Sequence, residues 1–182
     1  MKAMTTMKLL ENRTPINQLV SLSEPDPEIH CAAPRKRILV ADDDLAVRTS
    51  LARVLEAENY VTILASTGRQ AVSLFTHDAP DLVLLDINMP DKDGWQAFEL
   101  MERSRPLVPM IVITARPNQY ERATRLGIDA LMEKPLDLPL LLQTIQKLLG
   151  EPPRQRIAHL TAPDFATTLL SRTNGSERKR WS

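Results

Sequence analysis

The amino-acid sequence predicts an α/β protein built on a doubly wound, five-stranded parallel sheet with helices on both faces. Short apolar runs alternate with segments of helical period between residues 37 and 150. The runs are continuously apolar, as in strands buried on both faces. Proline, glycine or aspartate stands at most of the boundaries. Such alternation is typical of right-handed β-α-β units that share one parallel sheet.

The predicted strands are short, and the third is the most apolar. Pro80 and Pro109 stand before the third and fourth strands, where proline interrupts regular structure. The fifth run is shorter than the others and is the weakest prediction. In chain order the strands are expected at residues 38–41, 60–65, 82–85, 110–113 and 128–132.

Each strand is followed by a segment whose apolar residues recur at helical spacing. Asp44 and Asp137 precede two of these segments, where a carboxylate caps the free N–H groups of the first turn. Gly127 is placed to end the fourth helix in the left-handed conformation. The helical periods cover residues 45–55, 68–75, 94–101, 118–126 and 141–149.

The segments on either side of this domain lack a comparable pattern. Residues 1–36 contain four prolines and no sustained period, which predicts a flexible leader. The polar and basic sequence of residues 151–182 predicts a flexible tail, with at most a short helix at 163–171. A helix-turn-helix output domain needs about 60 residues, and only 32 follow Gly150. We therefore expect a stand-alone domain, 37–150, with no DNA-binding domain.

Composition excludes several functions. Basic and acidic residues balance at 23 each, so net charge points to no nucleic-acid partner. Cys31 is the only cysteine, which excludes an internal disulfide and a cysteine metal cluster. The five glycines do not form the G-x-G-x-x-G pattern of dinucleotide binding. No apolar run is long enough to span a membrane and no secretory signal is visible, so a cytoplasmic protein is expected.

Polar side chains follow the predicted strands at one edge of the sheet. Asp42 and Asp43 follow the first strand, Asp86 the third, Thr114 the fourth and Lys134 the fifth. The carboxyl ends of parallel strands meet at one edge, which in open α/β sheets holds the ligand crevice. We therefore expect these side chains to lie close together.

The chemistry of this set points to phosphoryl transfer. Clustered carboxylates repel one another unless a cation neutralises them, and Mg²⁺ prefers carboxylate, water and phosphate oxygens. A carboxylate can also act as a nucleophile toward phosphorus. The transition state then needs positive charge beside the equatorial oxygens, which Mg²⁺ and one ammonium group supply.

These motifs resemble the receiver domain of two-component response regulators, the family of the chemotaxis protein Y. Any one of them would be weak evidence alone, but four occur in the family's order and spacing. The matching stretches are Ile38–Asp44, Leu84–Gly94, Ile113–Ala115 and Lys134–Pro135.

The resemblance implies a flavodoxin-like strand order 2-1-3-4-5. It also implies that Asp86 is the phosphoacceptor and that Lys134 and Thr114 bind and sense the phosphoryl group. Mg²⁺ would be held by Asp42, Asp43, Asp86 and the backbone carbonyl of Asn88. The phosphoryl donor would be a histidine kinase or a histidine phosphotransfer protein, and the output would pass to a downstream protein target.

One departure from the family keeps an alternative open. Leu131 stands where the family usually has an aromatic residue that moves with the threonine. A phosphate-independent interaction module of receiver-like fold is therefore a second hypothesis. An aspartyl-nucleophile phosphatase is a third, disfavoured because that class needs a second aspartate where Asn88 stands. On the main hypothesis the protein is no enzyme beyond catalysing its own phosphorylation and dephosphorylation.

Overall fold

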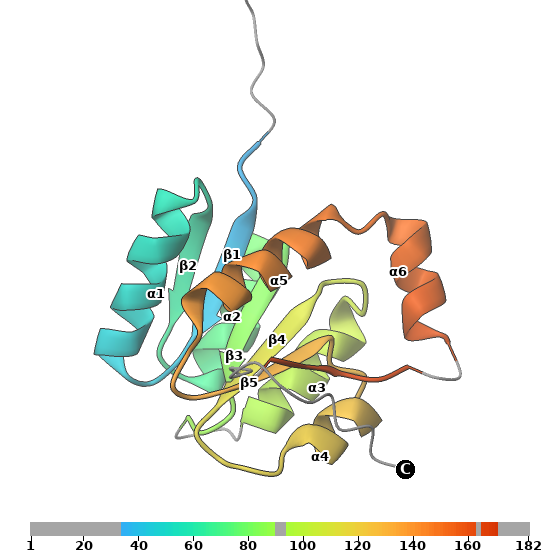
Figure 1. Ribbon diagram of the computed structural model, residues 1–182. Helices are drawn as coiled ribbons and strands as arrows, with labels where there is room; N and C mark the ends of the chain where they lie inside the picture. Colours follow the sequence, from blue (N-terminus) through green and yellow to red (C-terminus); the bar gives the residue numbers. More distant parts are fainter. Residues whose placement is uncertain (1–33, 90–93, 163–164, 171–182) are drawn as a thin grey trace, which may run out of the picture. The chain divides into compact units, whose positions relative to one another are not determined.

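The centre of the computed structural model is a parallel sheet of six strands in the order β2-β1-β3-β4-β5-β6 (Figure 1). The structure describes residues 34–89, 94–162 and 165–170. All of them belong to one compact unit that starts at Pro34. The strands are β1 Arg37–Ala41, β2 Val61–Ala65, β3 Leu82–Asp86, β4 Met110–Thr114, β5 Ala130–Glu133 and β6 Thr168–Leu170.

The described residues form six helices around the sheet. The side of α2, α3 and α4 contributes Phe75, Trp95 and Ala123 to one buried cluster, and the side of α1 and α5 contributes Leu55 and Ile145 to another. The sheet is thus covered on both faces, as predicted. The helices are α1 Leu45–Ala57, α2 Gly68–Asp78, α3 Gly94–Ser104, α4 Tyr120–Arg125, α5 Leu138–Gly150 and α6 Pro153–Leu160.

The helix boundaries follow the capping residues. The Asp44 carboxylate accepts hydrogen bonds from the first N–H groups of α1, and the Asp137 carboxylate accepts one from Leu140. Gly127 follows α4 with φ of 76°, the left-handed conformation that glycine adopts without steric cost. The three predicted caps are therefore confirmed.

The central strands are the most deeply buried. Every residue of β3 and of β4 is buried. This is the environment that their continuous apolar sequences predict, because neither face of a covered central strand meets water. The order 2-1-3-4-5 implied by the resemblance is found within the sheet.

The C-terminal part of the sequence prediction needs correction. A sheet of five strands and a flexible tail were expected, but residues 153–170 add helix α6 and a sixth strand, β6, parallel to β5. A short helix was expected at 163–171, where Thr168–Leu170 is extended instead. The predicted leader, 1–36, lies outside the described residues up to position 33. Among the described helices, none has the length and apolar character needed to cross a membrane.

Candidate functional site

Three carboxylates meet where β1 and β3 end. The two strands are neighbours, with Ala41 beside Leu85, so Asp42 and Asp86 emerge side by side. Asp43 follows Asp42, and one oxygen from each of the three carboxylates lies within 4.8 Å of the others. Asp42 and Asp86 are buried, at 1% and 2% exposed, whereas Asp43 is exposed. The result is an acidic pocket with one open side.

Lys134 reaches this pocket from the carboxyl end of β5. Its Nζ donates to Asp86 Oδ2 at 2.7 Å and to Asp42 Oδ2 at 3.0 Å. The Lys134–Pro135 peptide bond is cis. One ammonium group therefore bridges two buried carboxylates that come from different strands.

The pKa values of this cluster reflect burial and pairing together. Burial alone lowers the pKa of Lys134, but its hydrogen bonds to Asp86 and Asp42 outweigh that effect and raise the pKa above its ordinary value. Burial raises the pKa of Asp42, although hydrogen bonds from Lys134 and from the Asp44 N–H work in the opposite direction. The pocket holds more negative charge than one lysine balances.

Backbone groups orient the two buried carboxylates. The Asn88 N–H donates to Asp86 Oδ1 at 2.8 Å, and the Asp44 N–H donates to Asp42 Oδ1 at 2.9 Å. Each bond fixes one carboxylate oxygen while Lys134 binds the other. Both carboxylates are thus held in one orientation before any ligand binds, which lowers the cost of a reaction at that position.

Thr114 lies at the end of β4, completely buried. Its hydroxyl accepts from the Arg116 N–H at 2.9 Å, so it is engaged with the loop that follows the strand. The Thr114 carbonyl accepts from the Lys134 N–H at 2.8 Å, which ties the ends of β4 and β5 together. In the part of the chain that the structure describes, hydrogen bonds bring Asp42, Asp86, Lys134 and Asn88 together, whereas the Thr114 hydroxyl is bonded to the following loop.

The donor set of the pocket fits a small divalent cation. Carboxylate and carbonyl oxygens are the ligands that Mg²⁺ prefers, and three carboxylates supply them. The Asn88 side-chain oxygen is buried at this site without a hydrogen-bond partner among the described residues. A divalent cation would also offset the excess of negative charge that Lys134 leaves.

Two supporting residues, Arg48 and Gly94, were assigned no role at the site in the sequence analysis. Arg48, on the first turn of α1, donates from Nη1 to the Asp42 carbonyl. Gly94 opens α3 so close to β3 that an added Cβ would lie 2.4 Å from the Ile87 Cα and 2.5 Å from the Asp86 carbonyl oxygen. Glycine is therefore required beside Asp86. The position of Gly94 eight residues after Asp86 could have indicated this role, because it closes one of the family's motifs, whereas no sequence pattern indicated a role for Arg48.

A family model decides the assignment. The model described as "Response regulator receiver domain" matches residues 38–146, which include the whole pocket. The chain belongs to this receiver-domain family. Receivers are signalling proteins of two-component systems and not classical enzymes, and phosphoaspartate and Mg²⁺ are standard features of the family.

Curated relatives include two response regulators named MprA. The protein from Mycolicibacterium vanbaalenii is 42% identical over 115 residues, which cover 62% of this chain and 50% of the relative. The protein from Mycobacterium leprae is 36% identical over 136 residues, which cover 74% of this chain and 60% of the relative. The chain thus spans about half the length of the curated relatives that it matches.

Solved receiver structures share the fold. A CheY-like receiver domain protein from Methanospirillum hungatei has 31% sequence identity and a TM-score of 0.62, covering 66% of this chain and 98% of that one. The response regulator TrrA from Thermotoga maritima, in complex with Mg²⁺ and BeF, has 29% identity and a TM-score of 0.59, covering 62% and 98%. Receiver domains bind Mg²⁺ at an acidic pocket of the kind described above.

The relatives correct one expectation from the sequence. We predicted no DNA-binding domain because few residues follow position 150. Response regulators of the MprA type carry a DNA-binding output domain, and so does the regulator NtrX from Brucella abortus, another structural neighbour. The prediction was therefore wrong: it rested on the residues after position 150 of this sequence, which spans only about half the length of those relatives.

Proposed function

We propose that this receiver is a phosphorylation-dependent switch in which Asp86 accepts a phosphoryl group, with Mg²⁺, from a histidine kinase or a histidine phosphotransfer protein. The observation that carries the proposal is the 2.7 Å hydrogen bond between the Lys134 ammonium and a buried Asp86 carboxylate. We take the receiver to extend over residues 37–150.

The residues of the pocket have distinct parts in this reaction. An Asp86 oxygen forms the new bond to phosphorus as the bond from phosphorus to the donor's imidazole nitrogen breaks, and the electron pair stays with the imidazole. Lys134 moves its ammonium from the Asp86 carboxylate to the phosphoryl oxygens. Asp42, Asp43, Asp86 and the Asn88 carbonyl would hold Mg²⁺, which neutralises charge on the transferring group.

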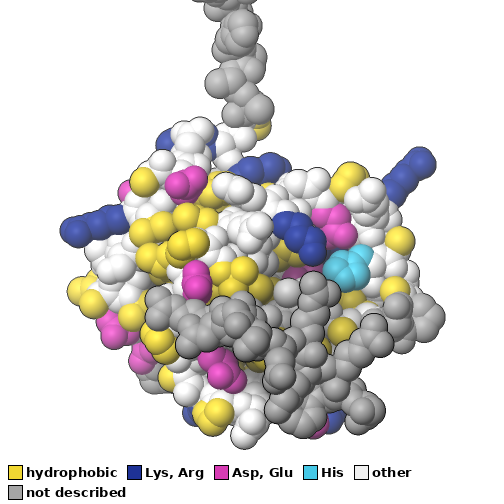
Figure 2. Space-filling view, viewed as in Figure 1, with side chains coloured by type: hydrophobic (Ala, Val, Ile, Leu, Met, Phe, Trp, Pro, Cys, Tyr) yellow, Lys and Arg dark blue, Asp and Glu magenta, His cyan; other side chains and the backbone are white. Residues whose placement is uncertain are grey.

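A donor protein has an apolar surface to dock on beside the pocket. Leu45, at the start of α1, is 67% exposed. A neighbouring groove between α1 and the start of α5 is lined by apolar residues that include Val47, Leu136 and Leu138. Figure 2 shows hydrophobic side chains gathered between these two helices. Burial of such a surface favours association with another protein, which supports a macromolecular donor.

Thr114 is proposed to sense the new phosphoryl group. Its hydroxyl now accepts a hydrogen bond from Arg116. That hydroxyl also donates to the Arg116 carbonyl at 3.4 Å, and a phosphoryl oxygen would compete with this carbonyl for the hydroxyl proton, so the loop 115–119 would lose one of its attachments. A ligand shifts a conformational equilibrium only by interacting differently with two states, and this exchange of partners supplies a difference. The changed surface would pass the signal to another protein.

Labelling with a small phosphodonor tests the proposal. Incubation with acetyl phosphate and Mg²⁺ should add one acid-labile phosphoryl group, detected by intact mass. D86N should abolish it. D44N serves as the matched control, because Asp44 is a neighbouring exposed carboxylate that caps α1. Wild-type protein that never gains a phosphoryl group would instead favour the phosphate-independent interaction module.

A further inference from the structure

The C-terminal arm, defined as residues 153–162 and 165–170, covers the outer edge of β5. Strand β6 pairs in parallel with β5, with Thr168 beside Ala130 and Leu170 beside Met132. The Thr168 N–H donates to the Asp129 carbonyl at 2.9 Å. Without the arm, β5 would be an edge strand with unpaired backbone groups, which are a template for pairing with another chain.

One buried ion pair anchors the arm. Arg156 of α6 is 4% exposed and binds Asp129, also 4% exposed, through two hydrogen bonds of 2.8 and 3.0 Å. Its Nε also donates to the Leu107 carbonyl at 2.6 Å. Asp129 immediately precedes β5 and accepts from the Met110 N–H at 2.8 Å. The arm is thus fixed at the amino end of β5, opposite the acidic pocket.

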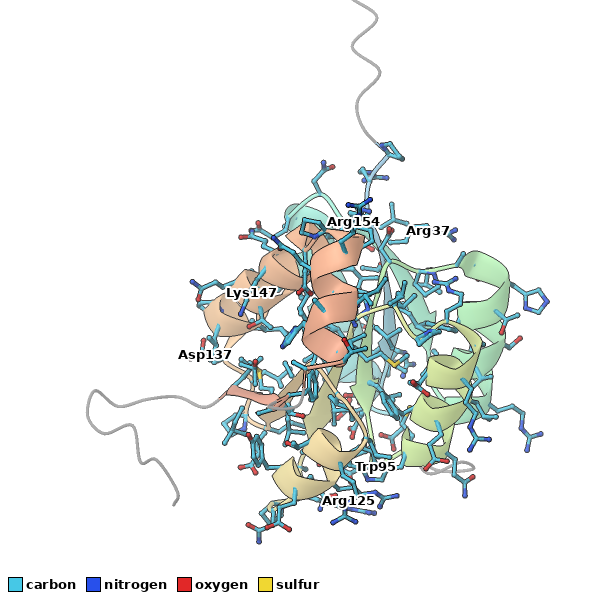
Figure 3. The ribbon with its side chains drawn as sticks, turned by 90° about the vertical axis from the view of Figure 1, so that its right-hand side faces the viewer. Arg37, Trp95, Arg125, Asp137, Lys147 and Arg154 are labelled. Atoms are coloured by element: carbon cyan, nitrogen blue, oxygen red, sulfur yellow. The ribbon has the colours of Figure 1, made fainter. Side chains whose placement is uncertain are left out.

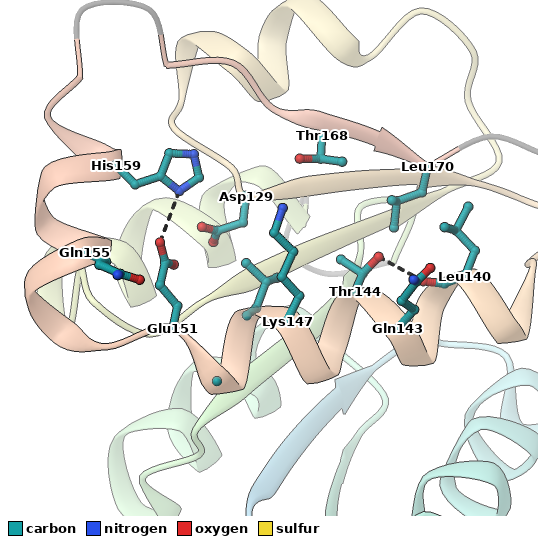
Figure 4. Close-up of a pocket in the computed structure, with 12 residues that line it drawn as sticks. Asp129, Leu140, Gln143, Thr144, Lys147, Glu151, Gln155, His159, Thr168 and Leu170 are labelled. Atoms are coloured by element: carbon teal, nitrogen blue, oxygen red, sulfur yellow. Dashed lines mark hydrogen bonds and ion pairs between the residues drawn. The ribbon is translucent and has the colours of Figure 1, made fainter.

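The rest of the arm is held more loosely. A hollow of about 590 Å³ lies between α5 and the arm, where Lys147, Glu151 and His159 face it (Figure 4). His159 contacts Glu151 at 3.6 Å. Leu169 of β6 is 48% exposed, whereas Leu170 packs into the core at 5% exposed. Two of the three residues of β6 are exposed, and few buried contacts lower the free energy of local opening.

Strand β5 connects the arm to the acidic pocket. It has four residues, and Lys134 follows it directly. The amino end of β5 is attached to the arm through Asp129, and its carboxyl end is attached to Asp86 through Lys134. Three of its four residues, Ala130–Met132, pair with β6. Any shift of Lys134 therefore acts on the strand that carries the arm.

We propose that docking of the C-terminal arm on β5 and phosphorylation of Asp86 are coupled, so that phosphorylation loosens the arm. This inference rests on the function proposed above. Phosphoryl oxygens lie farther from the Asp86 backbone than the carboxylate oxygen that Lys134 now binds, so Lys134 must shift outward to reach them. Met132, which pairs with Leu170 of the arm, stands two residues before Lys134, so a movement of Lys134 reaches this pair first. Loosening the arm uncovers the β5 edge more often in the phosphorylated protein.

Hydrogen exchange on the full chain tests the coupling. Mg²⁺ with beryllofluoride serves as the phosphoryl mimic, and the amides of 86–89 report its binding while those of 168–170 report the arm. We expect the Thr168 amide to exchange about fivefold faster or more in the presence of the mimic, the lower end of typical coupling between two sites.

Two arm variants test the reverse direction. R156A removes the buried ion pair that anchors the arm. T167V is a milder change, because it removes only the hydrogen bond from the Thr167 hydroxyl to the Ile128 carbonyl at 2.7 Å. R154A is the matched control, because Arg154 lies exposed on the same helix (Figure 3). Coupling between two sites is reciprocal. A variant whose arm is open should therefore bind beryllofluoride more tightly than wild type, by the same factor by which beryllofluoride increases the opening of the arm in wild type. T167V keeps this test available if R156A fails to fold.

Each outcome decides between the two proposals. Binding of the mimic at 86–89 with faster exchange at 168–170 supports the coupling. Binding at 86–89 with unchanged exchange in the arm overturns the coupling and leaves the proposed function standing. Failure of the mimic to bind at 86–89 overturns the proposed function, and the coupling with it.

Discussion

Replacing Lys134 with methionine removes the one ammonium group that bridges Asp42 and Asp86 while keeping a side chain of similar length. The two carboxylates are 2% and 3% exposed at their side chains, and Lys134 is 24% exposed. Breaking a fully buried ion pair costs about 3–5 kcal/mol, because the remaining charge is left uncompensated. Water can enter on the Lys134 side, which reduces this cost. We therefore expect K134M to lose about 2–3 kcal/mol of unfolding free energy at pH 7 without Mg²⁺.

The assay for this prediction is urea unfolding of wild type, K134M and the control K147M, which removes an exposed lysine of α5. The control should lie within about 0.5 kcal/mol of wild type. Adding D42N to K134M should restore part of the loss, because it removes one of the two unbalanced charges. Saturating Mg²⁺ should also narrow the gap. If K134M were as stable as K147M, the bridge would contribute nothing and our account of the pocket would be wrong.

The pH dependence of this difference has a definite sign. The folded pKa of Lys134 is raised. Its contribution to stability is therefore fully present below the unfolded lysine value of 10.5, and it is lost as pH rises through the higher folded pKa. The difference in unfolding free energy between wild type and K134M should persist from neutral pH to about pH 10 and shrink above that pH.

Three further predictions concern the metal, the glycine and a surface carboxylate. Mg²⁺ at ten times its Kd should raise the unfolding free energy of wild type and of the D44N control by about 1.4 kcal/mol, and D43A should lose this response; an unchanged response would remove Asp43 from the metal site. G94A should cost about 3 kcal/mol because its Cβ meets backbone atoms, whereas G150A, with open space around it, should be near neutral; equal stabilities would contradict the close approach of α3 to β3. Burial raises the pKa of Asp81, but the Arg37 N–H and Lys36 lower it overall, so its contribution is present above the ordinary value of 3.8 and lost as pH falls through the lowered one. The unfolding free energy of D81N should therefore be about 1 kcal/mol below that of wild type at pH 7, and the two values should converge in acid. A difference that stayed constant across that pH range would show that the Asp81 carboxylate is not its source.

Much of the fold could be predicted because local sequence and burial agree. Asp44 and Asp137 cap the helices that their positions predict, and the apolar run 82–85 forms a strand that is buried throughout. These features depend on hydrogen bonds and periods within a few residues. They can therefore be recognised without knowledge of the tertiary structure.

The pocket could be predicted because topology brings the strand ends together. Asp42, Asp86 and Lys134 are far apart in sequence, yet each follows a strand of the same parallel sheet. The prediction did not extend to hydrogen-bond partners. The Thr114 hydroxyl binds the Arg116 N–H, and Arg48 binds the Asp42 carbonyl, because loop and helix geometry at these points decide the contacts.

The C-terminal arm could not be predicted because its anchor depends on a long-range ion pair. Arg156 appears in sequence as one charge of a polar tail, and only the tertiary structure places it against a buried Asp129. A three-residue strand such as β6 also carries too little sequence pattern to recognise. Leu131 is completely buried, with β6 beside it, at the position where the family usually has an aromatic residue.

The most direct test of the central claim is to locate the phosphoryl group by chemistry that marks its carboxylate. After labelling with acetyl phosphate and Mg²⁺, borohydride reduction converts an acyl phosphate to an alcohol, so a phosphorylated aspartate becomes homoserine. Trypsin should release the peptide 70–92, which contains Asp78, Asp81, Asp86 and Asp91. We predict homoserine at position 86 and at no other position of this peptide. Homoserine at 78, 81 or 91, with aspartate intact at 86, would contradict the account.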